Sequence, residues 1–293
     1  MTVRVGSKVR APVTIVEQGR ARKRLDYLAA EEPLDIRLQA GGQTKTVAVT
    51  MRTPGADFEL AAGFLHSEGI VTERGLIRHI SYCVDPAVDP EQRYNIVNVG
   101  LHLPALPELA TLERHFYTTS ACGVCGKASL EAIEIRGCSV LPPGPVVDAA
   151  VLTSLPEKLR AEQSLFESTG GLHAAGLYSG AGELLCLRED VGRHNAVDKI
   201  VGWALLNRKL PLSDCILLVS GRASYEILQK STVAGVPIVC AVSAPSHLAV
   251  DVARQFGVTL VGFLRGERFT IYAGEERIRL LELPPHQSVF PSA

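Results

Sequence analysis

The sequence predicts two domains, a strand-rich α+β domain over residues 1–145 and an α/β domain over residues 146–293. The chain has 293 residues, whereas single hydrophobic cores stop growing at about 250–300. The segment Leu141-Pro142-Pro143-Gly144-Pro145 cannot continue a helix or a central strand, which places a linker there. After this linker, apolar strands alternate with helices, as in βαβ units of a sheet covered on both faces.

In the first domain, two strand patterns lie on either side of one helix. Residues 44–51 alternate between apolar and polar side chains, and residues 93–103 form a second apolar run, as strands do. Between them, Thr53-Pro54 provides an N-cap and a proline at the first helical position, and Gly69 is placed to end the helix.

The second domain has the expected element order αββαβαβαβ. A helix over residues 151–163 precedes two strands, 172–178 and 183–188, whose short connection makes them a hairpin. A helix that includes Trp203 then leads to a series of three apolar strands. These strands span residues 215–220, 236–243 and 258–264, and the helices between them end at Gly235 and Gly257.

The charge and hydropathy of the chain exclude several classes of partner. Lysine and arginine number 30 against 31 acidic residues, so the formal net charge of −1 gives no field that would attract nucleic acid or an anionic membrane. No apolar run approaches the roughly 20 residues that span a bilayer, and the N-terminus lacks the pattern of a secretory signal. We therefore expect a cytoplasmic protein with no membrane or nucleic-acid partner.

Ligands of such sheets bind beyond the carboxyl ends of the parallel strands. The three apolar strands run into Ser220–Ser224, Ser243–Ser246 and Phe263–Arg268. Small residues there allow close approach to an oxyanion, and Arg222, Arg265 and Arg268 can donate forked hydrogen bonds to phosphate. Each loop taken alone also fits an ordinary turn with solvated arginines, but their convergence on one edge favours a phosphorylated or nucleotide-like ligand.

Two histidines near this edge have two open interpretations. His194 precedes a predicted helix in Gly192-Arg193-His194-Asn195, and His173 follows Gly170-Gly171. Each is either a ligand-binding or proton-handling group, or a capping or buried structural histidine.

The pair Cys122 and Cys125 is the candidate reactive centre. The other five cysteines are scattered, and buried free cysteine behaves as a small apolar residue; they are Cys83, Cys138, Cys186, Cys215 and Cys240. A predicted helix follows from Ala128, so both thiols lie at a helix N-terminus, where the dipole and Lys127 lower the thiol pKa.

Four kinds of chemistry suit a CxxC pair. Structural zinc needs a second pair, which is missing, and no metal site is predicted. A deaminase zinc site needs a His-x-Glu opening a helix, whereas His66-Ser67-Glu68 falls at a helix end and Ala121 replaces the required proline. A thioredoxin-like site should follow a strand directly, whereas a predicted helix over 108–115 intervenes. Spacing alone leaves disulfide exchange and persulfide carriage open.

Several blocks in order resemble the FdhD/NarQ family, the formate dehydrogenase accessory sulfurtransferases. The match runs from about Arg52 to Tyr272, and the ends, Met1–Arg24 and Pro284–Ala293, which match no block, are expected to be disordered. The blocks are Thr53-Pro54-Gly55, Glu59–Phe64, Cys122–Gly126, Gly192–Lys199, Ser220-Gly221-Arg222 with Glu226 and Lys230, and Ala234-Gly235.

This resemblance implies a sulfurtransferase that accepts sulfur from a cysteine desulfurase and delivers it to the molybdenum cofactor before the cofactor enters formate dehydrogenase. Cys122 matches the persulfide-bearing cysteine and Cys125 its partner, as a relay or as a resolving thiol. The ligand would be molybdenum bis(molybdopterin guanine dinucleotide), carried as cargo. The family's cofactor segment maps onto Phe263, Leu264, Arg265, Gly266, Glu267 and Arg268, near Arg222 of the first loop.

The resemblance also implies a cytidine-deaminase-like, three-layer arrangement of the second domain and a homodimer. Two rival functions stay open: a chaperone that binds the molybdenum cofactor without sulfur transfer, and a CxxC thiol-disulfide oxidoreductase.

Overall fold

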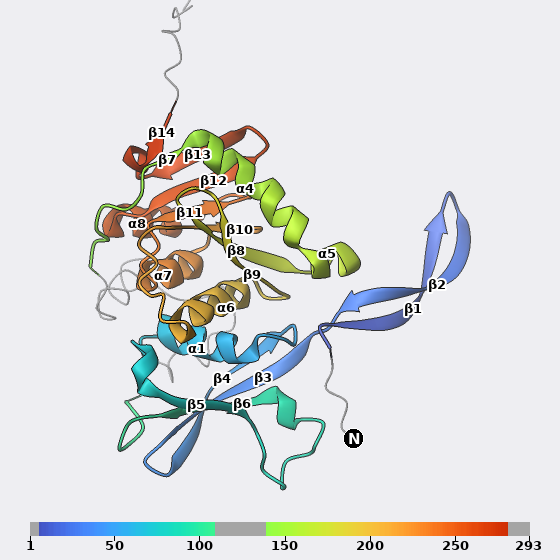
Figure 1. Ribbon diagram of the computed structural model, residues 1–293. Helices are drawn as coiled ribbons and strands as arrows, with labels where there is room; N and C mark the ends of the chain where they lie inside the picture. Colours follow the sequence, from blue (N-terminus) through green and yellow to red (C-terminus); the bar gives the residue numbers. More distant parts are fainter. Residues whose placement is uncertain (1–5, 109–138, 281–293) are drawn as a thin grey trace, which may run out of the picture.

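The computed structural model describes residues 6–108 and 139–280 (Figure 1). Cys122, Cys125 and the helices predicted around them lie outside these residues. Within the described part, no helix is long and apolar enough to cross a membrane.

The first half forms a projecting hairpin and a four-stranded sheet covered by one helix. The hairpin consists of β1 (Lys8–Glu17) and β2 (Arg20–Ala29). The sheet has the order β4-β3-β6-β5, in which only the β3–β6 pair is parallel. In chain order, the strands of this sheet, the helix that covers it and two 3-10 turns are β3 (Glu32–Ala40), β4 (Gln43–Arg52), α1 (Asp57–Ser67), η1 (Arg74–Leu76), β5 (Ile77–Tyr82), η2 (Arg93–Asn95) and β6 (Ile96–Leu101).

The expectation of a disordered N-terminus is wrong for residues 8–24. Here β1 and β2 pair along their whole length, from Lys8 with Ala29 to Glu17 with Arg20. Gln18 and Gly19 have φ values of 50° and 77°, and two consecutive positive φ angles are typical of the tight turn that matches the twist of a hairpin. The alternation of apolar and polar residues along β1 is therefore a strand pattern.

The predicted start of the first helix also needs correction. The helix α1 begins at Asp57, after Ala56 in the left-handed region, and not at Pro54. The Thr53 hydroxyl accepts a hydrogen bond from the backbone N–H of Val191 (3.2 Å), so it joins the two halves of the chain instead of capping α1.

The second half contains the predicted series of elements around a six-stranded sheet. The strand order is β13-β12-β11-β10-β8-β9, with β10, β11 and β12 parallel and β8–β9 a hairpin. The helical elements are α4 (Ala149–Glu162), α5 (Ser164–Thr169), α6 (Arg193–Leu206), α7 (Tyr225–Val233), α8 (His247–Phe256) and the 3-10 turn η3 (Glu275–Arg277). The strands are β7 (Val147–Asp148), β8 (His173–Ser179), β9 (Leu184–Asp190), β10 (Cys215–Val219), β11 (Ile238–Ala241), β12 (Thr259–Arg265), β13 (Arg268–Ala273) and β14 (Ile278–Arg279).

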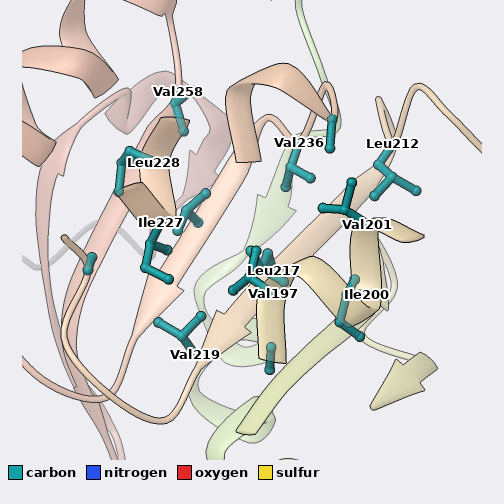
Figure 2. Packing of buried hydrophobic residues seen from close by; sticks show 14 of the residues in the cluster. Val197, Ile200, Val201, Leu212, Leu217, Val219, Ile227, Leu228, Val236 and Val258 are labelled. Atoms are coloured by element: carbon teal, nitrogen blue, oxygen red, sulfur yellow. The ribbon is translucent and has the colours of Figure 1, made fainter. Parts of the chain in front are cut away.

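Helices cover both faces of this sheet. On one face, apolar side chains of α6, α7 and α8 pack against β10, β11 and β12, and Figure 2 shows Val197, Ile227 and Val219 in this core. On the other face, Leu152, Leu155 and Leu159 of α4 are buried against the sheet. The predicted order αββαβαβαβ is present, and the elements added to it are β7, α5, β13, η3 and β14. The boundary after residue 145 stays a prediction.

The two halves meet where α1 crosses α6 (Figure 1). A Cβ atom on Gly63 would lie 1.8 Å from the carbonyl oxygen of Asp198, and one on Gly202 would lie 1.8 Å from that of Glu59. The helices are therefore in backbone contact at two glycines. Leu205 of α6 is buried in the core of the first half, while the opposite side of α6 belongs to the core of the second.

We expect Gly63→Ala and Gly202→Ala to destabilise the protein strongly, because the new methyl group would overlap backbone atoms that side-chain rotation cannot move. The free energy of unfolding should fall by about 3 kcal/mol or more, measured by urea denaturation. Gly75→Ala is the matched control, since a Cβ there meets only the side chain of Glu73 at 3.6 Å. Equal stability of the Gly63 and Gly75 variants would contradict this packing.

Candidate functional site

The three loops beyond β10, β11 and β12 lie side by side, as the sequence predicts. Backbone N–H groups link them in series: Ser243 donates to Gly221 (3.3 Å), and Phe263 donates to Ser243 (3.1 Å). A further bond runs from the Ser246 N–H to the Ala223 carbonyl (2.9 Å). Small residues allow this approach, because a Cβ on Gly262 would lie 2.9 Å from Pro245. We call these linked segments, 220–224, 243–246 and 263–268, the loop edge.

The last segment of the loop edge presents an aromatic ring and two cations. Phe263 has φ 52° and is 43% exposed, next to an irregular pairing of β12 with β13. With Arg265, Arg268 and Thr270, it lines a hollow of about 350 Å³. This volume falls in the range of small-molecule sites, about 300–1,000 Å³. The Arg265 Nε donates a hydrogen bond to the Val242 carbonyl (2.9 Å), which holds the Arg265 side chain in place.

The other predicted cofactor residues do not line this hollow. Leu264 is fully buried in the core that includes α4. Gly266 has φ 53° in the turn between β12 and β13, and Glu267 is exposed beside it. Arg222 is exposed on the first loop.

A second cluster lies at the first loop, where β8 and α6 begin. A Cβ on Gly221 would lie 3.4 Å from the His173 Nδ1 and 4.0 Å from the Arg193 Cδ, so both side chains flank this glycine. The His194 Nε2 lies 3.3 Å from the Ser224 hydroxyl and 3.6 Å from the Glu226 carboxylate. Within the described residues, the Arg193 Nε is buried without a hydrogen-bond partner.

Both imidazoles of this cluster favour the neutral form. Burial lowers the pKa of His194 to about 4, against the opposing attraction of Glu226, and the nearby Arg193 lowers it further. Burial and Arg193 also lower the pKa of His173. The histidines can therefore donate or accept hydrogen bonds near pH 7 while Arg193 provides the positive charge. Sequence reasoning missed Arg193, although the block Gly192–Asn195 contained the signal.

Much of the block Gly192–Lys199 joins the halves of the protein. Lys199 is buried and pairs with Asp190 (2.7 Å), and its Nζ also donates to the Thr53 carbonyl (3.0 Å). The Asn195 Nδ2 donates to the Met51 carbonyl (2.7 Å). Asp198 accepts hydrogen bonds from the side chains of Lys230 and Ser67. These contacts hold β9, α6 and α7 against the first half.

The cysteines in the described part of the chain are unsuited to nucleophilic chemistry. Burial raises the pKa of Cys186 to about 11, and it raises the pKa of Cys240 and Cys215 as well. Cys83 is buried, and all four are free thiols. The described residues contain no group of three or more metal-ligating side chains. His66 of the His-x-Glu triplet lies in the last turn of α1, where its Nδ1 contacts the Val71 carbonyl (2.8 Å).

The fold and loop edge define a class: an α/β protein whose strand-rich half is joined through packed helices to a sheet with a cationic loop edge. The model of the FdhD/NarQ family matches residues 29–279. The chain belongs to the FdhD/NarQ family.

Relatives with known names resemble the chain over most of its length. The sulfur carrier protein FdhD of Streptomyces avermitilis is 53% identical over 92% of this chain and 95% of its own, and that of Mycobacterium tuberculosis is 48% identical over 87% and 92%. A crystal structure from Desulfotalea psychrophila, described as a candidate formate dehydrogenase accessory protein, has a TM-score of 0.69. It is 25% identical, and the match covers 93% of this chain and 99% of that chain.

We expect the lowered pKa of His194 to make stability depend on pH. The unfolded chain takes up a proton near pH 6.5, whereas folded His194 resists it until about pH 4, so its contribution is present above pH 6.5 and is lost as the pH falls toward 4. His194→Gln should therefore lose less stability than the wild type between pH 7 and pH 5 in urea denaturation.

The exposed His247 provides the control, as His247→Gln should keep the pH dependence of the wild type. NMR titration checks the same point directly. A midpoint for the His194 ring near its ordinary value of about 6.5 would contradict the burial of this imidazole.

Proposed function

We propose that this protein is a sulfur carrier that accepts sulfur from a cysteine desulfurase on Cys122 and delivers it to the molybdenum cofactor of formate dehydrogenase. A relative that is 53% identical over 92% of this chain is named a sulfur carrier protein, which supports this function most directly. Burial raises the pKa of Cys186, Cys215 and Cys240, which makes these three thiols poorer nucleophiles than an exposed CxxC pair would be.

The loading step is a thiol–persulfide exchange without net oxidation. The Cys122 thiolate attacks the outer sulfur of the donor's persulfide. A new S–S bond forms on Cys122 while the donor's S–S bond breaks, and the donor cysteine leaves as a thiolate. The proton of the persulfide stays on the transferred sulfur, so Cys122 ends as a persulfide. Cys125 then acts as a relay or must be kept from expelling this sulfur.

The cargo, molybdenum bis(molybdopterin guanine dinucleotide), suits the loop edge. Its phosphates match the forked donors of Arg265 and Arg268 at the hollow, together with Arg222 on the first loop. The exposed ring of Phe263 offers an apolar face to a guanine. Neutral His173 and His194 beside Arg193 extend the same edge with donors and acceptors.

Three further properties complete the proposal. The helices on both faces of the six-stranded sheet support a cytidine-deaminase-like, three-layer domain. Two copies of the chain associate as a homodimer. The protein works in the cytoplasm with a cysteine desulfurase as donor and a formate dehydrogenase as recipient of the cofactor.

We expect Cys122 to gain one sulfur atom when the full chain is incubated with a cysteine desulfurase and cysteine. Mass spectrometry of the alkylated peptide should show the added sulfur on Cys122. Cys122→Ala should abolish the gain, and Cys215→Ala should leave it unchanged, because Cys215 is a partly buried thiol of raised pKa.

Two results would contradict sulfur carriage. Formate dehydrogenase activity in cells that contain only Cys122→Ala would favour a chaperone that binds the cofactor without transferring sulfur. Turnover of a dithiol substrate without desulfurase would favour a thiol-disulfide oxidoreductase.

We expect Arg268→Ala to weaken binding of GDP, the probe for the guanine dinucleotide part of the cargo. A hydrogen bond between charged groups contributes about 1.5–3 kcal/mol, so the Kd measured by calorimetry should rise about tenfold or more. Arg268→Lys should recover part of the affinity, because lysine keeps the charge but loses the forked geometry. Arg279→Ala is the control, since Arg279 pairs with Asp148 on β7. An unchanged Kd for Arg268→Ala would remove this arginine from the site.

A further inference from the structure

The hairpin of β1 and β2 projects from the body of the molecule as a two-stranded ribbon (Figure 1). It is anchored near its base, where the Ala30 N–H donates to the Ser7 carbonyl (3.0 Å) and the Ser7 hydroxyl donates to the Pro54 carbonyl (2.7 Å). Its contact with the second half is between β2 and α5. The match of the family model begins at residue 29, at the end of this ribbon.

Apolar side chains are exposed on the ribbon. Val16 is 65% exposed and Leu25 is 66% exposed, and the register places both on the same face as Pro12. An isolated two-stranded hairpin is at best marginally stable in water, because it has no core of its own. The ribbon therefore gains stability when another surface covers it.

The opposite face combines aliphatic residues with a row of arginines. Directly paired residues of antiparallel strands point to the same side, and the pairs here are Val13 with Arg24, Ile15 with Arg22, and Glu17 with Arg20. Among the described residues, Arg22 and Arg24 make exposed ion pairs with Glu17 (3.4 Å) and Asp26 (3.1 Å). Such pairs contribute little and leave the arginines available to a partner.

The ribbon is positively charged, whereas the rest of the chain is negatively charged. Residues 8–29 contain six basic and two acidic residues, a formal charge of +4, whereas the whole chain has −1 and the remainder therefore −5. The segment between β5 and η2 has the complementary character. It exposes Asp85, Asp89 and Glu91 together with Val84, which is 82% exposed, and Arg93 fixes its shape through the Val88 carbonyl (3.0 Å).

We propose that the hairpin is an arm that binds the acidic segment 84–91 of a second copy of this chain, and that two such arms are exchanged symmetrically. This deepens the homodimer of the proposed function by naming the surfaces that form it. Arginines of the arm face the carboxylates of the partner copy, and Val13 and Ile15 cover Val84.

The area available favours exchange of two arms over the use of one. Ten residues per strand at about 3.3 Å each give a ribbon about 33 Å long and about 10 Å wide, or about 330 Å² per face. One arm would bury about 660 Å² over both partners, which is too little for a stable interface, whereas two arms bury about 1,300 Å², within the usual range. A two-fold axis satisfies this requirement, since each copy has one arm and one acidic segment.

Light scattering with size-exclusion chromatography tests the arm in the full chain. The wild type should be a dimer, and the triple change Arg20→Glu, Arg22→Glu and Arg24→Glu should raise the dimer Kd by at least about tenfold at physiological salt. The triple change Asp85→Lys, Asp89→Lys and Glu91→Lys leaves the arm intact and should weaken the dimer equally. Combining both sets restores opposite charges and should restore the dimer.

Control changes and sulfur loading separate this proposal from the proposed function. Arg208→Glu with Arg254→Glu reverses two exposed charges elsewhere and should leave the dimer unchanged. A monomeric wild type, or a dimer that survives both triple changes, would overturn the proposal. Another contradicting result would be that reversing the charges of the arm arginines abolishes binding to duplex DNA but leaves the dimer intact. Sulfur gain on Cys122, measured on the same samples, reports on sulfur carriage alone.

Discussion

The backbone contact between Gly63 of α1 and Gly202 of α6 is the constraint on which the rest of the structure depends. It allows α6 to pack against the first half on one side and against the six-stranded sheet on the other. The buried Lys199–Asp190 pair and the Asn195 amide then connect the halves with polar groups whose burial is costly unless they are paired. The loop edge is thereby held in a fixed position relative to the strand-rich half.

The sequence predicted most of the second half, because its strands are apolar throughout and its helices end at glycines such as Gly257. It missed the β1–β2 hairpin. The apolar residues of this hairpin alternate along its strands but stay exposed in the monomer, so their pattern does not indicate a buried face. It also misplaced the start of α1. A hydroxyl that caps a helix and one that accepts a hydrogen bond from a distant backbone N–H, as Thr53 does, look the same in the sequence. Local patterns do not separate these two uses of a hydroxyl group.

For the candidate site, convergence of the three loops followed from strand order, whereas the side chains at the edge did not. Only the structure shows that Leu264 is buried in the core while Phe263 and Arg268 line a hollow. The neutral state of His194 results from burial outweighing the attraction of Glu226, a balance that depends on packing and not on spacing. Cys122 and Cys125 lie outside the described residues, so their assignment still rests on family resemblance.

The backbone hydrogen bonds that tie the three loops together have a kinetic consequence. Ordering a flexible backbone costs about 1–2 kcal/mol per residue, and at the loop edge folding of the domain has already met that cost. A large ligand can therefore dock on a surface that is already ordered, and little of its interaction energy is spent on immobilising loops. The residence time of the proposed cargo would then be set by its direct contacts with the loop edge, which have to be weak enough for it to leave.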